Sequence, residues 1–197
     1  PTGSGKSTTL ASMIQHLNCT APVHVITIED PIEFVYEDKM AVINQRELGL
    51  DTGSLHNALR AALRQDPDVI LMGEMRDPET ISFGITAAET GHLVFATLHT
   101  NDAKQTIERI LDTMPPDARD MVRAQIAVLL RAIVCQHLCK RADGTGPVAA
   151  QEILVNSPQM SQLIEEGKTR SIDRALMEGS YYGMQTFNQA LYKLVQD

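Results

Sequence analysis

The chain has 197 residues, enough to bury one substantial hydrophobic core and too few for more than two small domains. Its apolar content of 43% and charged content of 21% are ordinary values for a globular protein. The net charge of −8 argues against nucleic acid as the main partner, because binding to a phosphate backbone depends on basic surface. No stretch of about 18 uninterrupted apolar residues and no signal peptide is recognisable, so no segment is expected to cross a membrane.

The chain begins with a glycine-rich stretch, Pro1-Thr2-Gly3-Ser4-Gly5-Lys6-Ser7, that matches the phosphate-binding pattern G-x-x-x-x-G-K-[ST] apart from its opening glycine. Gly3 and Gly5 allow backbone N–H groups to turn inward around phosphate oxygens. Lys6 can then reach the β- and γ-phosphates, and the Ser7 hydroxyl can bind Mg²⁺. The alternative is a glycine turn that caps an ordinary helix. The residues expected to bind nucleotide are Thr2, Gly3, Ser4, Gly5, Lys6, Ser7 and Thr8.

Strands and helices are expected to alternate in the first half of the chain. In order, the pattern predicts a helix through residue 16, a strand at 23–28, an irregular or short-stranded region at 32–53, a helix capped by Ser54 or Thr52 and closed by Gln65-Asp66-Pro67, a strand at 68–72, a helix at 78–90 and a strand at 93–98. The strands lack polar alternation, which is typical of a parallel sheet covered on both faces. Because a buried strand normally precedes such a glycine-rich stretch, we expect the sequence to be part of a longer chain.

Helices are expected to dominate the second half. The pattern predicts a helix capped by Asn101 or Asp102, a longer helix from about 117 to 134, a hairpin formed by 134–141 and 147–155, and three further helices. We therefore expect an α/β fold: a P-loop core with a mostly parallel sheet, a β-hairpin and a C-terminal helical appendage. The expected domains are a core over 1–155 and a helical subdomain over 156–197.

Three cysteines are scattered along the chain: Cys19, Cys135 and Cys139. An odd number without regular spacing suits a reducing cytoplasm better than a disulfide framework. The last two form a Cys-x₃-Cys pair, but a structural zinc site needs four ligands and the sequence offers no second pair. We therefore interpret the cysteines as small packing residues.

Three predicted strands end in polar residues: Glu29-Asp30, Glu74 and His99. In open parallel sheets, ligands bind beyond the carboxyl ends of the strands, where a phosphate-binding loop also lies. An acid that follows an apolar strand, as Glu74 does, can hold Mg²⁺ or orient an attacking water, and His99 could hydrogen-bond a γ-phosphate. The alternatives are a solvated loop carboxylate for Glu74, an Asp-Pro turn for Glu29 and Asp30, and a structural histidine for His99.

Four further residues are weaker candidates. His92 begins the third predicted strand, roughly 20 Å from its far end at about 3.3 Å per residue, so it is not expected to touch the same phosphate. Arg60 and Arg64 are four apart on one predicted helix and therefore neighbours, and Arg76 lies in the loop after the second strand. These arginines could reach a nucleotide bound by a neighbouring subunit, or could belong to a solvated helix face.

Four runs of residues, in this order, resemble the motifs of the secretion ATPase superfamily. They are Pro-Thr-Gly-Ser-Gly-Lys-Ser-Thr (1–8) for Walker A, Ile-Glu-Asp-Pro-Ile-Glu (28–33) for the Asp box, residues 64–77 for Walker B and residues 90–100 for the His box. Within the superfamily the chain resembles the PilT family of type IV pilus retraction ATPases, and the resemblance extends through residues 182–186 to the end. The assembly and type II secretion branches carry a paired-cysteine zinc module that this chain lacks, which favours the retraction branch.

The resemblance implies the RecA-like domain of a homohexameric, Mg²⁺-dependent ATPase that powers pilus retraction and twitching motility, with a PAS-like domain preceding it in the family. It implies that Lys6 binds the phosphates of ATP, Ser7 the magnesium ion and His99 the γ-phosphate. Glu29 and Glu74 would share water activation and Mg²⁺ coordination, and the choice of catalytic base between them stays open. The implied location is cytoplasmic, peripheral to the inner face of the bacterial membrane, with the pilus platform protein as partner.

One segment departs from the family pattern. In the family this segment carries two arginines and is associated with retraction, and residues 159–166 lack both. The motifs of this sequence therefore support ATP hydrolysis more fully than they support retraction. Two alternatives within the superfamily stay open: an assembly or secretion ATPase, and a nucleotide-gated regulatory subunit with little turnover. A RecA-type DNA translocase is a third, which the acidic charge disfavours.

Overall fold

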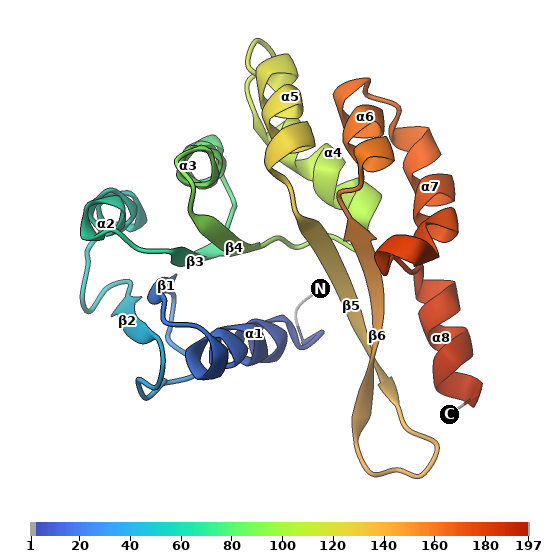
Figure 1. The fold of residues 1–197 in the computed structure, drawn as a ribbon, viewed down its shortest axis with the longest axis horizontal. Coiled ribbons are helices and arrows are strands. Elements are labelled where there is room, and N and C mark those ends of the chain that lie inside the picture. The colour runs from blue at the N-terminus through green and yellow to red at the C-terminus, as the bar shows by residue number, and fades with distance from the viewer. Residues whose placement is uncertain (1–2, 197) are drawn as a thin grey trace. The chain divides into compact units, whose positions relative to one another are not determined.

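The computed structural model describes residues 3–196 (Figure 1). These residues form two compact units: Lys6–Leu98, here called the sheet unit, and residues 3–5 with 99–196, here called the hairpin unit. The expected α/β class, with a mostly parallel sheet, a β-hairpin and C-terminal helices, is confirmed. The division into a core over 1–155 and a helical subdomain over 156–197 does not coincide with these units and stays a prediction.

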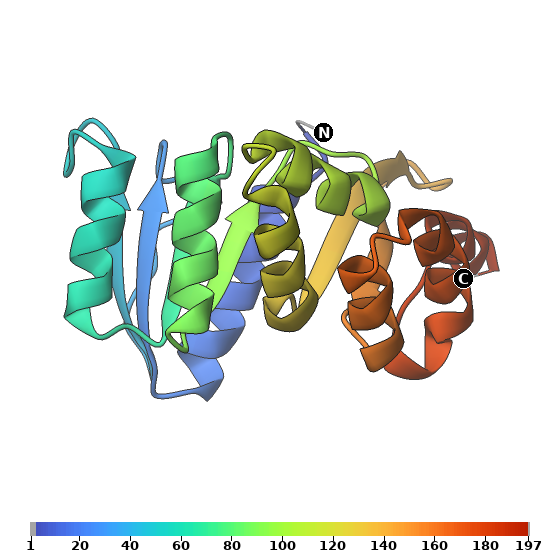
Figure 2. The same cartoon turned by 90° about the horizontal axis from the view of Figure 1, so that it is seen from above.

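The sheet unit alternates helices and strands as expected. Its elements are α1 (Lys6–Thr20), β1 (His24–Glu29), β2 (Val42–Glu47), α2 (Leu55–Ala62), a 3₁₀ turn (Leu63–Gln65), β3 (Val69–Glu74), α3 (Pro78–Glu89) and β4 (Leu93–Thr97). The four strands are parallel and lie in the order β2-β1-β3-β4. Helix α1 covers one face of this sheet, and α2 and α3 cover the other (Figures 1 and 2).

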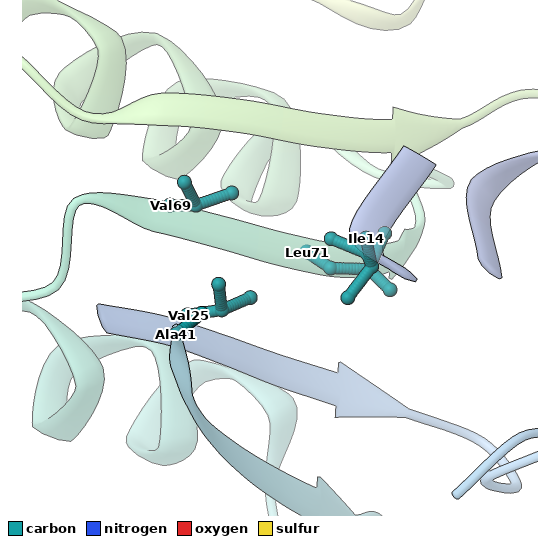
Figure 3. Close-up of a cluster of buried hydrophobic side chains, with 5 residues drawn as sticks. All are labelled: Ile14, Val25, Ala41, Val69 and Leu71. Atoms are coloured by element: carbon teal, nitrogen blue, oxygen red, sulfur yellow. The ribbon is translucent and has the colours of Figure 1, made fainter. Parts of the chain in front are cut away.

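Alternate side chains of β1 divide the apolar core between the two faces of the sheet. Val25 packs with Ile14 of α1, whereas Ile26 and Ile28 pack with Leu59 of α2. The cluster on the α1 face consists of Ile14, Val25, Ala41, Val69 and Leu71 (Figure 3). Odd-numbered residues of β1 therefore face α1, and even-numbered residues face α2 and α3. Both faces are buried, which explains why the strand sequences show no polar alternation.

Side chains close to the chain's turns fix where the helices of this unit begin. The Ser54 hydroxyl accepts a hydrogen bond from the backbone N–H of Asn57, which confirms one of the two expected caps of α2. Asp77 caps α3 and forms a reciprocal capping box with Thr80. Pro78 follows at the first helical position, where its missing N–H costs nothing.

The hairpin unit consists of one antiparallel strand pair and the helices that pack with it. Its elements are α4 (Ala103–Thr113), α5 (Arg119–Leu129), β5 (Ala132–Lys140), β6 (Pro147–Val155), α6 (Pro158–Glu165), a 3₁₀ turn (Thr169–Ser171), α7 (Ile172–Glu178), a second 3₁₀ turn (Gly179–Tyr182) and α8 (Phe187–Gln196). Asp102 caps α4, as one of the two expected candidates. Helix α4 packs against β5, and α8 runs beside β6 (Figure 1). Within residues 3–196, no helix combines the length and apolar character needed to span a membrane.

The helix predicted over 117–134 is too long. Helix α5 ends at Leu129, and the backbone of Leu130 is no longer helical. Ile133 lies in β5. The Asn156 side chain, which follows β6, donates hydrogen bonds of 2.9 Å to the carbonyl oxygens of both Ala127 and Leu130. These bonds help to satisfy carbonyl groups at the helix end, and the Ser161 hydroxyl also donates to that of Ala127. The apolar spacing continues past the helix end, so the sequence pattern does not mark the boundary.

Candidate functional site

The glycine-rich stretch forms a turn that opens directly into α1. Gly3 and Gly5 have φ angles of +75° and +86°, the left-handed region that favours glycine. Backbone that alternates between left-handed residues, here Gly3 and Gly5, and a residue of negative φ, here Ser4, turns successive N–H groups toward a common point, where an anion can bind. Helix α1 begins at Lys6 and has no acidic residue in its first turn, so its own side chains do not neutralise the positive end of the helix dipole. Ser7 and Thr8 are exposed there, and Thr2 lies outside the described residues.

Glu29 ends β1 on the face of the sheet that α1 covers. It is two residues beyond Thr27, which is fully buried, and four beyond Val25 of the α1-face cluster. The Thr27 hydroxyl donates a 2.7 Å hydrogen bond to Glu29 Oε1, and the Gln45 amide donates a longer one of 3.3 Å from β2. A side chain of its own strand and one of the neighbouring β2 thus fix the Glu29 carboxylate. Burial raises the pKa of Tyr36 to about 12, with the nearby charge of Glu29 acting in the same direction.

A β-bulge turns Glu74 toward the same face. Leu71 pairs with Phe95 of β4 and Glu74 with Thr97, so β3 holds one more residue than β4 between these pairs. Phe95 packs against the α1-face cluster, and Thr97 lies two residues further along β4 on the same face. Without the extra residue Glu74 would point toward α2 and α3. The bulge therefore brings Glu29 and Glu74 to one face at the carboxyl end of the sheet.

Arg76 contacts Glu74 in the loop that follows β3. Its Nη2 and Nε atoms lie 2.6 Å and 2.7 Å from Glu74 Oε2. The hydrogen bond and charge of Glu74 raise the pKa of Arg76, and the charge of Asp30 adds to this in the same direction. Asp30, Glu74 and Arg76 thus interact at one edge of the sheet.

The expectation that Arg60 and Arg64 are neighbours on one helix stays a prediction, since a 3₁₀ turn continues α2 without a break. Helix α2 ends at Ala62, and Arg64 lies in the 3₁₀ turn that follows. The turn leads into Asp66, whose φ is +51°, immediately before Pro67. A residue before proline is disfavoured in the helical region, so the helix cannot continue. Both arginines are exposed.

The two candidate histidines lie in different settings. His92 Nδ1 is 2.9 Å from the carbonyl oxygen of Ala87 and 3.0 Å from the Thr90 hydroxyl oxygen, so the ring is anchored to the end of α3. It lies at the opposite end of β4 from the carboxylates. His99 is exposed and belongs to the hairpin unit, between the end of β4 and the start of α4.

One polar residue in contact with the glycine-rich stretch was not predicted. The Gln136 amide nitrogen of β5 donates a buried 2.7 Å hydrogen bond to the carbonyl oxygen of Ser4. Ser4 and Gln136 are 132 residues apart in the sequence, and no local motif marks Gln136. Only the apolar setting of Gln136 in a predicted strand could have drawn attention to it.

The cysteines are free thiols, with Cys19 exposed and Cys135 buried. Burial raises the pKa of the Cys135 thiol to about 11. In the part of the chain that the structure describes, no three His, Cys, Asp or Glu side chains gather as a metal-binding cluster. Oxygen donors of the kind that Mg²⁺ prefers are present singly, as the Ser7 hydroxyl and the Glu74 carboxylate.

Comparisons with known proteins agree with this geometry. The chain is 55% identical over 196 residues to a twitching motility protein of Neisseria gonorrhoeae, an alignment that covers all of this chain and 52% of that protein. It is 51% identical over 195 residues to the type IV pilus retraction ATPase PilT of Pseudomonas aeruginosa, covering 99% of this chain and 56% of PilT. A crystal structure of the pilus retraction motor PilT with bound ADP matches with a TM-score of 0.92 and 50% identity, covering all of this chain and 55% of that one.

The chain therefore spans about half the length of these relatives. An ATPase named DotB from Legionella pneumophila also matches in structure, with a TM-score of 0.88 and 34% identity over 99% of this chain and 54% of that one. The family model described as type II/IV secretion system protein matches residues 1–145. This match and the identity to the relatives show that the chain belongs to the type II/IV secretion system protein family.

Proposed function

We propose that this chain is the nucleotide-hydrolysing part of a motor that retracts type IV pili, driven by Mg²⁺-dependent hydrolysis of ATP. The observation that carries the proposal is the placement of Glu29 and Glu74 on the face of the sheet that α1 covers, in a chain whose phosphate-binding sequence pattern runs into the start of α1. The names of the relatives support it, since both a twitching motility protein and PilT align along nearly the whole chain.

Each residue of this arrangement has a role that its chemistry suits. The backbone N–H groups of the turn and the start of α1, together with Lys6, would bind the phosphates and stabilise charge on the transferring phosphoryl group. Glu29, fixed by Thr27, would accept a proton from the attacking water or orient it. His99 would contact the γ-phosphate. Thr2, Ser4 and Thr8 would complete the loop around the nucleotide.

Ser7 and Glu74 fit a magnesium ion that is bound together with nucleotide. Both offer oxygen atoms, and Mg²⁺ is usually held by one or two protein oxygens, substrate phosphates and water. When bound, the ion would neutralise charge that develops on the phosphate oxygens. Glu74, which is half-buried, would need to exchange its contact with the exposed Arg76 for this role.

Steady-state phosphate release by the full-length protein tests the proposal. Lys6→Ala removes the side-chain charge at the phosphates and should abolish turnover, and Glu29→Gln and Glu74→Gln should each lower kcat by about 100-fold or more. Lys39→Ala, which removes an exposed lysine outside the proposed site, is the matched control. Turnover near that of the unmodified protein in Lys6→Ala would refute the proposal.

The partners and location follow from the same proposal. The chain would act in a homohexamer at the cytoplasmic face of the bacterial inner membrane and would transmit force to the platform protein of the pilus. Arg60, Arg64 and Arg76 are exposed and could reach a nucleotide held by a neighbouring subunit. Mass measurement of the full-length protein with and without nucleotide tests the assembly.

The ion pair between Arg76 and Glu74 favours a second candidate, a nucleotide-gated subunit with little turnover, because it engages a carboxylate that hydrolysis would need. Arg76→Ala separates the two. Under the second candidate, phosphate release is near background and rises when the arginine is removed. Under the first, unmodified protein hydrolyses ATP at a rate of order 1 s⁻¹ or above, within the ordinary range for enzymes.

A further inference from the structure

Gln136 is buried beside the glycine-rich turn and contacts it in two ways. Its amide nitrogen donates the 2.7 Å hydrogen bond to the Ser4 carbonyl oxygen, and both residues are less than 10% exposed. The same nitrogen lies 2.6 Å from the place that a Cβ atom on Gly5 would occupy. The Gln136 side chain therefore contacts the backbone of the turn directly, at Ser4 and beside Gly5.

The hydrogen bonds of the Gln136 amide determine its orientation. A carbonyl oxygen can only accept, so the atom beside Ser4 must be the amide nitrogen. The Gln136 oxygen then accepts a 2.8 Å hydrogen bond from the amide nitrogen of Gln151, its register partner on β6. Gln151 in turn accepts at its backbone carbonyl a 3.0 Å bond from the Gln185 side chain. Gln151 on β6 thus fixes the orientation of the Gln136 amide on β5.

The peptide between Ser4 and Gly5 links this hydrogen bond to the anion site. Its carbonyl belongs to Ser4 and its N–H to Gly5, and in a planar trans peptide these two groups point in opposite directions. By holding the carbonyl, Gln136 directs the Gly5 N–H away from the hairpin. A loop that binds phosphate through backbone N–H groups depends on the direction of each of them.

We propose that Gln136 is a positioning residue that aims the Gly5 N–H at the nucleotide phosphates, and that Gln151 supports it. The inference rests on the proposed nucleotide binding and deepens it by assigning to the hairpin a part in shaping the phosphate-binding loop. Gln136 itself does not touch the nucleotide. Its effect passes through one peptide group.

The test measures the dissociation constant of full-length protein for a fluorescent ADP in the presence of Mg²⁺. Gln136→Met keeps the length of the side chain and removes the donor, and we expect roughly ten-fold weaker binding at neutral pH. Gln162→Met makes the same change on the exposed surface of α6, where the side chain bonds only Glu166 among the described residues, and should leave binding unchanged. Gln151→Met should weaken binding by about three-fold, since it acts through Gln136.

Gln136→Glu separates positioning from a general loss of structure. A carboxylate cannot donate to the Ser4 carbonyl, whereas a protonated carboxyl can. Binding by this variant, relative to unmodified protein at the same pH, should be weak at about pH 7.5 and should recover as the pH falls toward about 5.5. Damage to the fold alone would give no such recovery.

Three results would overturn the inference. Binding by the Gln136 variants that equals that of unmodified protein would do so and would leave the proposed function intact. A loss of affinity in Gln136→Glu that does not depend on pH would show a merely structural role. If Gln136→Met does not fold, unchanged affinity in Gln151→Met and pH-independent binding by Gln136→Glu decide against it. Unmodified protein that binds no nucleotide would instead refute the proposed function, and this inference with it.

Discussion

Replacing Gly5 with alanine should destabilise the protein more than the same change at Gly3, although both glycines have left-handed backbones. The backbone strain is common to the two sites and costs an L-residue about 1–2 kcal/mol. At Gly3, no atom of the described residues lies within 4 Å of the added methyl group. At Gly5 the methyl carbon would lie 2.6 Å from Gln136 Nε2, well inside contact distance. The Gln136 amide must then move and release the buried Ser4 carbonyl, which costs about a further 1–3 kcal/mol.

Urea unfolding of the full-length protein, followed by circular dichroism, gives both losses. We expect about 1–2 kcal/mol for Gly3→Ala and about 2–5 kcal/mol for Gly5→Ala. Adding Gln136→Ala to Gly5→Ala should cost less than the sum of the single changes, because both disrupt the same hydrogen bond. Equal losses at Gly3 and Gly5, or full additivity in the double variant, would show that the turn does not depend on contact with Gln136.

Three further predictions concern the core, one carboxyl group and the thiols. Ile14→Ala should lower the free energy of unfolding by about 2–5 kcal/mol in the urea assay, because Ile14 is fully buried in the cluster of Figure 3; a loss below about 1 kcal/mol would contradict the packing. Burial raises the pKa of Glu152, so folding favours the protonated carboxyl. The resulting stabilisation is present below the ordinary pKa of about 4.3 and is lost as the pH rises through the folded pKa. Thermal unfolding of Glu152→Gln should therefore show a gain in stability over unmodified protein that grows from about pH 4 to pH 7. In thiol labelling at about pH 8, exposed Cys19 should react in the folded protein, and Cys135, with its pKa of about 11, only after unfolding, so rapid labelling of Cys135 in native protein would refute its burial.

Local signals in the sequence predicted most of the sheet unit. Continuous apolar runs mark β1, β3 and β4, Ser54 marks the start of α2, and glycine followed by lysine marks the phosphate-binding turn. Each of these signals acts within a few residues of its own position. The polar residues at the strand ends were predicted to lie at one edge of the sheet because parallel strands share that edge.

The bulge in β3 could not be predicted in this way. An apolar run ending in Gly73-Glu74 gives no sign that one residue is left unpaired, because the bulge exists only in the pairing with β4. Yet it decides which face of the sheet Glu74 occupies. The sequence therefore supplied the residue type at the site, and the register of a neighbouring strand supplied its direction.

Long-range hydrogen bonds were missed for a related reason, and in the hairpin unit several of them come from residues in or directly after β6. Gln151 supports Gln136 behind the phosphate-binding turn, Glu152 accepts a 2.9 Å hydrogen bond from the N–H of Ala103 at the start of α4, and Asn156 satisfies the carbonyl groups at the end of α5. These three polar side chains lie within β6 or directly after it, and each bonds a group at least 15 residues away in the sequence. Leaving such groups unpaired costs about 1–3 kcal/mol each, so this short stretch should tolerate substitution less well than its modest apolar content suggests.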